Sequence, residues 1–251
     1  MNNNDTVLSV SHLSVMYQKN RVLQDVCFSL NRGACVGIVG PNGAGKSSLL
    51  KSIMDIIPRV NGTVSFFGST LAKERKRIAY VSQRSSVDWD FPITVFDVAL
   101  MGSYVHLGWF KRPAEKEKHA TWQALQHVGM TSYAHQPIGL LSGGQQQRVF
   151  LARALVQDAD LYIMDEPFAG IDMVTEFMMV TLFKQLCAQG KTIIIVHHDL
   201  YSLDRYFDTL VVLNKSVVAC GAVNKVLQTD AVCTAYGRAM NCFPHTCLYG
   251  T

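Results

Sequence analysis

The sequence lacks the features of a membrane-spanning, secreted or nucleic-acid-binding chain. Its longest apolar runs, such as Ile193 to Val196, are far shorter than the roughly 20 residues that a membrane-spanning helix needs. Residues 1–5 have neither the basic nor the apolar region of a secretory signal. The 23 Lys and Arg residues against 19 Asp and Glu give a net charge of only +4, without a block of one sign, so we expect no nucleic-acid partner. These absences favour a cytoplasmic chain.

A disulfide framework is also missing. The seven cysteines are odd in number and scattered, which is typical of reduced thiols. The tail, residues 238–251, contains Cys242, His245 and Cys247, with Cys233 shortly before it, and such side chains can hold a soft metal ion. The tail is short and terminal, so the simpler interpretation is a peptide that happens to contain cysteines. The sequence leaves its role open.

The hydrophobic pattern indicates an α/β fold. Short alternating segments at 7–10, 13–17 and 22–30, separated by turn residues, predict an antiparallel sheet. Buried strands at 35–39, 161–165 and 192–197 alternate with helices, which predicts a parallel sheet covered on both faces. Residues 84–157 have helical periodicity instead. We therefore predict one domain over 1–237, with a core of 1–83 and 158–237 and a helical insert at 84–157.

A glycine-rich segment, Gly40 to Ser47, follows the first of these buried strands. It fits the P-loop pattern GxxxxGK[ST] at every specified position. Glycines let the backbone turn so that successive N–H groups face phosphate oxygens, and the helix that follows adds its positive end. In this pattern Lys46 reaches the β- and γ-phosphates and the Ser47 hydroxyl binds Mg²⁺.

Two acids, Asp165 and Glu166, end the apolar strand 161–165. Acids at the carboxyl end of a parallel strand lie at the edge of the sheet where ligands bind. After a P-loop, Asp165 is predicted to hold Mg²⁺ and Glu166 to orient and polarise an attacking water. The alternative is a solvated acidic strand end.

The segment Leu141 to Gln145 reads LSGGQ and is followed by Gln146, Gln147 and Arg148. With the P-loop and the acidic pair, in this order, it resembles the ATP-binding-cassette (ABC) ATPases over residues 7–237. The resemblance implies a P-loop NTPase fold with a RecA-like core, an antiparallel β subdomain and an inserted α-helical subdomain. It also implies ATP hydrolysis in a homodimer, in which Ser142 and Gly144 close the site of the opposite protomer. The alternative is a glycine-rich turn before a helix.

The resemblance implies further site residues. His198 takes the place of the switch histidine that senses the γ-phosphate, and His197 that of a small residue, where simple packing is the favoured interpretation. Gln83 matches the Q-loop glutamine, which touches Mg²⁺ or the attacking water. Tyr17 takes the place of the aromatic that stacks on adenine, although it also fits a plain sheet residue. Asp172 fits the loop after the catalytic acid, but many relatives have Ser or Thr where Ala169 stands.

Three groups of residues are thus expected at the site. The catalytic group is Glu166, His198, Gln83 and Lys46. The Mg²⁺ ligands are Ser47, Gln83 and Asp165. The residues expected to contact ATP are Tyr17, Gly40, Pro41, Asn42, Gly43, Ala44, Gly45, Lys46, Ser47, Ser48, Ser142, Gly143, Gly144, Gln145 and Asp172.

Residues 87–95, with Trp89 and Phe91, resemble the stretch after the Q-loop in ATPases of manganese, zinc and iron importers. The resemblance implies docking on integral membrane permease subunits at the inner face of the cell membrane, and an indirect link to an extracytoplasmic metal-binding protein. Trp89 and Phe91 either anchor that contact or pack the insert. The alternative function is a soluble, non-transport ABC ATPase that acts as a dimerisation switch on a protein or nucleic-acid partner.

Overall fold

The computed structural model describes residues 5–18, 20–82, 92–107 and 111–237. Its main sheet has six strands in the order β5-β6-β7-β3-β8-β9, and the only antiparallel pair among them is β8 with β9. All residues of β3, β6 and β7 are buried, which requires cover on both faces and confirms the predicted α/β architecture. The strands are β3 (Cys35–Val39), β5 (Ile78–Val81), β6 (Leu161–Asp165), β7 (Thr192–Val196), β8 (Thr209–Asn214) and β9 (Ser216–Ala222).

A second, antiparallel sheet has the order β2-β1-β4, with β1 (Thr6–Tyr17), β2 (Asn20–Asn31) and β4 (Asn61–Phe66). The predicted separate strands at 7–10 and 13–17 are wrong, because the structure has one strand throughout. Its register shifts between Val10 and Leu13, where His12 takes a φ of 53°. The interruption in the sequence pattern is therefore a β-bulge within one strand.

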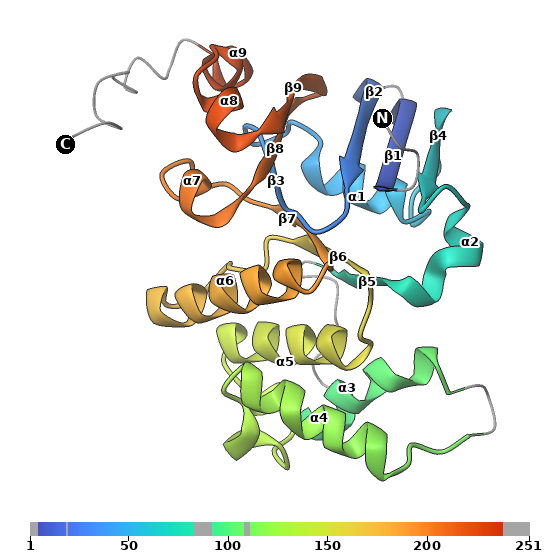
Figure 1. Cartoon of the computed structure of the whole chain (residues 1–251), viewed down its shortest axis with the longest axis vertical. Coiled ribbons are helices and arrows are strands. Elements are labelled where there is room, and N and C mark those ends of the chain that lie inside the picture. The colour runs from blue at the N-terminus through green and yellow to red at the C-terminus, as the bar shows by residue number, and fades with distance from the viewer. Residues whose placement is uncertain (1–4, 19, 83–91, 108–110, 238–251) are drawn as a thin grey trace.

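The helices between β5 and β6, namely α3, α4 and α5, gather at one end of the molecule, away from the three-stranded sheet (Figure 1). The division into core and insert stays an interpretation. The helices are α1 (Lys46–Ile53), α2 (Leu71–Glu74), α3 (Val95–Leu100), α4 (Glu115–His127), α5 (Gly143–Val156), α6 (Met173–Ala188), α7 (Leu203–Tyr206), α8 (Val223–Leu227) and α9 (Ala231–Tyr236).

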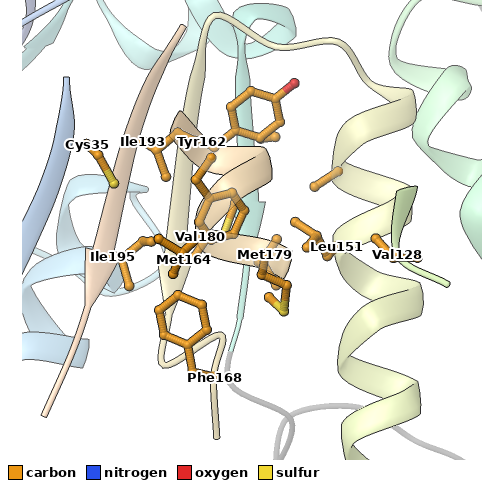
Figure 2. Packing of buried hydrophobic residues seen from close by; sticks show 14 of the residues in the cluster. Cys35, Val128, Leu151, Tyr162, Met164, Phe168, Met179, Val180, Ile193 and Ile195 are labelled. Atoms are coloured by element: carbon orange, nitrogen blue, oxygen red, sulfur yellow. The ribbon is translucent and has the colours of Figure 1, made fainter. Parts of the chain in front are cut away.

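The two faces of the six-stranded sheet pack into separate cores. Successive residues of a strand point to opposite faces, so Tyr162 and Met164 face one core while Leu161 and Ile163 face the other. Figure 2 shows the first core, where side chains of β6 and β7 lie against Leu151 of α5 and against α6. The second core joins the sheet to α1 and to the three-stranded sheet. Packing on both faces thus holds the strands of the main sheet in place, and this positions the loops that follow them.

None of the helices in the described part of the chain has the length and apolar character needed to cross a membrane.

Candidate nucleotide site

Three neighbouring parallel strands end at the same edge of the main sheet. The P-loop follows β3, Glu166 follows β6, and the two histidines follow β7, which lies between β3 and β6. Val196 of β7 is in register with both Asp165 and Ile38. The structure therefore brings the predicted P-loop, acidic pair and histidines to one edge, where ligands of open α/β sheets bind.

The P-loop backbone depends on its glycines. A Cβ at Gly40 would lie 2.0 Å from the carbonyl oxygen of Leu213, so only glycine fits between β3 and β8. Gly43 and Gly45 have φ values of 80° and 95°, which favour glycine as well. Gly45 is also the N-cap of α1, without a side-chain cap, so the first N–H groups of this helix are left for another acceptor.

Lys46 lies across the inside of this loop. Its side chain is buried, and Nζ donates hydrogen bonds to the carbonyl oxygens of Gly40 at 2.6 Å and Pro41 at 3.0 Å. Burial lowers the pKa of Lys46, while the negative charges of Glu166 and Asp165 act in the opposite direction. A cation is thus held against the P-loop by two of its carbonyl oxygens.

Asp165 is fully buried beside the loop. Its Oδ1 accepts a hydrogen bond from Ser47 Oγ at 3.1 Å, while Oδ2 has no hydrogen-bond partner within the described residues. The pKa of Asp165 is raised, mainly by burial. The Ser47 hydrogen bond acts in the opposite direction, and the negative charge of Glu166 adds to the rise. A hydroxyl next to a carboxylate with an unused oxygen is a ligand set that suits Mg²⁺, so these residues fit the predicted ion.

Tyr80 of β5, which is not among the predicted site residues, lies next to this acid. Its buried hydroxyl has no hydrogen-bond partner in the described part of the chain. Burial, and then the negative charge of Asp165, raise the pKa of Tyr80 to about 12. The phenol is therefore a neutral polar group beside the carboxylate. Nothing in the local sequence signals this, since Tyr80 reads as an ordinary strand residue.

Glu166 has a φ of 52°, in the left-handed region that non-glycine residues rarely occupy. Such a conformation costs on the order of 1 kcal/mol or more and persists only where the surroundings enforce it. Here it comes at the first residue after a fully buried strand. The chain therefore turns sharply at Glu166, which suits a residue that must leave the sheet to meet a ligand.

The adjacent histidines have different surroundings. His197 is buried, with Nε2 2.9 Å from the Ser202 hydroxyl and its ring perpendicular to that of Phe168 at 5.7 Å. Burial lowers the pKa of His197 to about 4, although Asp199 opposes the shift. His198 is exposed. His197 is thus a packed, neutral histidine, in keeping with the favoured interpretation, and only His198 is open to a ligand.

The LSGGQ segment forms the start of α5. Ser142 is the N-cap, and it exchanges two hydrogen bonds with Gln145: its hydroxyl accepts from the Gln145 backbone N–H at 3.4 Å, and the Gln145 amide oxygen accepts from the Ser142 N–H at 2.8 Å. A Cβ at Gly144 would lie only 2.7 Å from the carbonyl oxygen of Gly170. The segment therefore packs against the loop that follows Glu166, with Ser142 exposed.

Two other predicted residues lie at the edges of the site. Asp172 caps α6, where its carboxylate accepts from the Thr175 N–H at 2.9 Å and the Thr175 hydroxyl at 2.7 Å. Tyr17 is 46% exposed at the end of β1. Leu23, in the same hairpin, has a side-chain atom 2.6 Å from the position of a Cβ at Gly45, so the hairpin reaches the P-loop. The contacts of Asp172 and Tyr17 with nucleotide stay predictions.

Several predicted residues cannot be placed. Gln83, Trp89 and Phe91, and the tail residues Cys242, His245 and Cys247, lie outside the described residues. Cys233 is half-buried on α9.

The chain is similar to known proteins along most of its length. The family model described as ABC transporter matches residues 23–169. The chain is 54% identical over 230 residues to the zinc transport system ATP-binding protein TroB of Treponema pallidum, covering 92% of this chain and 86% of that one. It is 48% identical over 232 residues to the manganese transport system ATP-binding protein MntB of Listeria innocua, covering 92% of this chain and 97% of that one.

Solved structures agree with these relatives. One, a putative metal-chelate type ABC transporter in an inward-facing conformation, has a TM-score of 0.78 at 26% identity and covers 92% of this chain and 88% of that one. Another, the ATP binding subunit of an ABC transporter, has a TM-score of 0.78 at 27% identity, covering 88% of this chain and 92% of that one. The matched region contains the P-loop, LSGGQ and the acidic pair. The chain belongs to the ABC transporter family, in which it is an ATP-binding subunit with ATPase activity.

Proposed function

We propose that the chain hydrolyses ATP to drive import of a divalent metal ion through a membrane permease. The observation that carries this proposal is the identity of 54% and 48% with proteins named for zinc and manganese transport. The same names argue against the alternative of a non-transport ATPase. Zinc and manganese are the ions to test first, and iron, which the sequence resemblance also suggests, follows them.

We assign the chemistry to the edge of the sheet described above. The P-loop N–H groups and Lys46 bind the phosphates, and His198 contacts the terminal one. Ser47, Asp165 and Gln83 hold Mg²⁺, which supplies positive charge to the transferring phosphoryl group when bound. Glu166 orients the attacking water and accepts its proton.

A homodimer would complete the site. Ser142 is exposed at the start of α5, beside the loop that contains Gly170, and this arrangement supports a contact with a second chain. The next helix adds exposed apolar side chains at Met173, Val174 and Phe177, which a partner surface would cover. In such a dimer, Ser142 and Gly144 of one chain close the nucleotide site of the other.

We further propose that the dimer docks on integral permease subunits at the inner face of the cell membrane. An extracytoplasmic metal-binding protein would deliver the ion, and this chain would not touch it. Trp89 and Phe91 are the proposed permease anchors, on the resemblance given above.

The proposal is tested by uptake of labelled zinc and manganese in cells that lack the native gene and express the chain or a variant. Glu166→Gln should abolish uptake of the ion that the unmodified chain transports, and it should trap a dimer with ATP bound. The matched control is Glu115→Gln, an exposed acid paired with Lys118, which should leave uptake unchanged. If Glu166→Gln stopped ATP turnover but left zinc, manganese and iron uptake intact, the transport assignment would be wrong.

A further inference from the structure

Three side chains with metal-binding atoms meet on the antiparallel sheet, outside the nucleotide site. His12 of β1 faces Asp25 and Cys27 of β2. The His12 Nδ1 atom lies 2.7 Å from Asp25 Oδ1 and 3.7 Å from Cys27 Sγ. All three ligand atoms lie within 4.8 Å of one another.

These separations are close enough for small side-chain rotations to seat a tetrahedral ion. Zinc binds sulfur at about 2.3 Å and nitrogen or oxygen at about 2.0–2.1 Å, so tetrahedral angles put its ligand atoms about 3.3–3.6 Å apart. The nitrogen–sulfur distance of 3.7 Å lies just above this range. The nitrogen–oxygen distance of 2.7 Å is that of a hydrogen bond, and a small rotation of the exposed Asp25 side chain would open it.

The backbone holds two of these residues in unusual conformations. His12 has a φ of 53° and Asp25 a φ of 50°, and the register of the strand pair shifts on both sides of Leu13. Gly62 of β4 supports the His12 bulge, because a Cβ at this glycine would lie 2.6 Å from the His12 carbonyl oxygen. The Ser14 hydroxyl accepts a hydrogen bond from the Asp25 N–H at 3.1 Å. The strands are thus built to turn these side chains toward one another.

We propose that His12, Asp25 and Cys27 form a binding site for one zinc-class divalent cation. Imidazole, carboxylate and thiolate are the ligand types that zinc takes in proteins, and three of them leave a fourth position open to water on this exposed surface. The thiolate and the Irving–Williams order both favour zinc over manganese here. The site is separate from ATP hydrolysis and does not depend on the proposed transport function.

A simpler explanation is a surface hydrogen bond between His12 and Asp25, with the Cys27 sulfur held nearby because it accepts a hydrogen bond from the His12 backbone N–H at 3.1 Å. The two explanations differ in what they require of the thiol. A hydrogen-bonded pair does not need Cys27, whereas a metal site loses a ligand with it. A test must therefore detect a bond between the metal and this sulfur.

The experiment is a titration of the purified, reduced full chain with Co²⁺, without nucleotide, read by the ultraviolet absorption of a cobalt–thiolate bond. Cys233, Cys242 and Cys247 are replaced by serine in all samples, so that the tail contributes no thiol. The signal should saturate at one ion per chain, and Zn²⁺ should displace Co²⁺. Mn²⁺ at the same concentration should not.

Variants locate the bond. Cys27→Ser should remove the thiolate signal. His12→Asn and Asp25→Asn should weaken Co²⁺ binding by about tenfold or more, and asparagine tolerates positive φ, so the bulges should remain. The control is Cys220→Ser, an exposed cysteine on β9, which should change nothing.

Two results would overturn the proposal: no cobalt–thiolate signal at millimolar Co²⁺, or a signal that survives Cys27→Ser. Because Glu166→Gln lies outside this site, it should bind Co²⁺ normally. Failure of the transport assay and failure of the metal site are therefore distinguishable.

Discussion

The P-loop side of the site and the LSGGQ side satisfy their polar groups in different ways. Around the P-loop, the charged side chains of Lys46 and Asp165 are buried and find partners within the chain. At LSGGQ, Ser142 is exposed, and within the described residues its side chain bonds only to the Gln145 N–H, as a helix cap. The first region is nearly complete in one chain, while in the second Ser142 stays exposed among the residues that the structure describes. The difference fits a nucleotide site made from two chains.

Removing the buried cation should have the largest effect. Lys46→Ala deletes the only side-chain charge that bonds to the loop carbonyls of Gly40 and Pro41 in the described structure. We expect ATP turnover to fall about 10²- to 10³-fold, as for loss of one preorganised donor. Lys225→Ala, an exposed lysine of α8, is the control and should keep full turnover. Turnover of Lys46→Ala within threefold of the unmodified chain would contradict the assignment.

Mixing two inactive variants tests whether the two regions act across chains. Gly144→Ala places a methyl group 2.7 Å from the Gly170 carbonyl oxygen, so it should displace the LSGGQ turn and abolish turnover without preventing ATP binding. A mixed dimer of Lys46→Ala and Gly144→Ala has one site with both regions intact. Half of the dimers in an equal mixture are mixed, so turnover should return to roughly a quarter of the normal rate.

The mixture also has a result that excludes the trans arrangement. If LSGGQ served the P-loop of its own chain, no chain in the mixture would have an intact site, and turnover would stay at the level of the separate variants. ATP binding by Gly144→Ala alone, measured by equilibrium dialysis, confirms that this variant is folded.

The burial of His197 should make the free energy of unfolding depend on pH. The pKa of His197 is about 4 in the folded chain against 6.5 ordinarily, so between these values the unfolded chain binds a proton that the folded chain excludes. The free energy of unfolding should therefore fall as the pH drops from 6.5 to 4, by about 3 kcal/mol from this residue.

The measurement is denaturant unfolding of the unmodified chain and of His197→Gln at pH 7 and pH 4. The variant should lose about 3 kcal/mol less on acidification, whatever its absolute stability. Lys116→Gln, at an exposed lysine of α4 far along the chain from His197, is the control and should not change the loss. Equal losses in all three proteins would show that His197 is not held neutral by burial.

The features of the fold and the site that can be predicted from the sequence are those that depend on a local pattern of residues. Buried strands followed by a glycine loop or by two acids identify the edge of the sheet, because parallel strands end together. The capping box of Ser142 and Gln145 is also visible in the sequence, as a Ser-x-x-Gln pattern. Asp172 and Thr175 show a similar cap.

Contacts between distant segments were not predictable in this way. The approach of Gly144 to Gly170, and of Tyr80 to Asp165, depends on how helices and strands pack, which spacing along the chain does not encode. The bulge at His12 was interpreted as a break between strands, since an irregular residue ends the alternating pattern in either case.

The smallest predicted effect separates the two roles of Ser142. As a cap it should contribute about 1 kcal/mol, so Ser142→Ala should lower the free energy of unfolding by that amount. Ser142→Asn keeps a capping side chain and should restore most of the stability but not the turnover, whereas Ser142→Thr keeps the hydroxyl and should preserve both. Urea unfolding and ATPase rates on the same samples make the distinction. If Ser142→Asn hydrolysed ATP at the normal rate, the hydroxyl would have only a structural role, and the LSGGQ side would differ less from the P-loop side than its exposure implies.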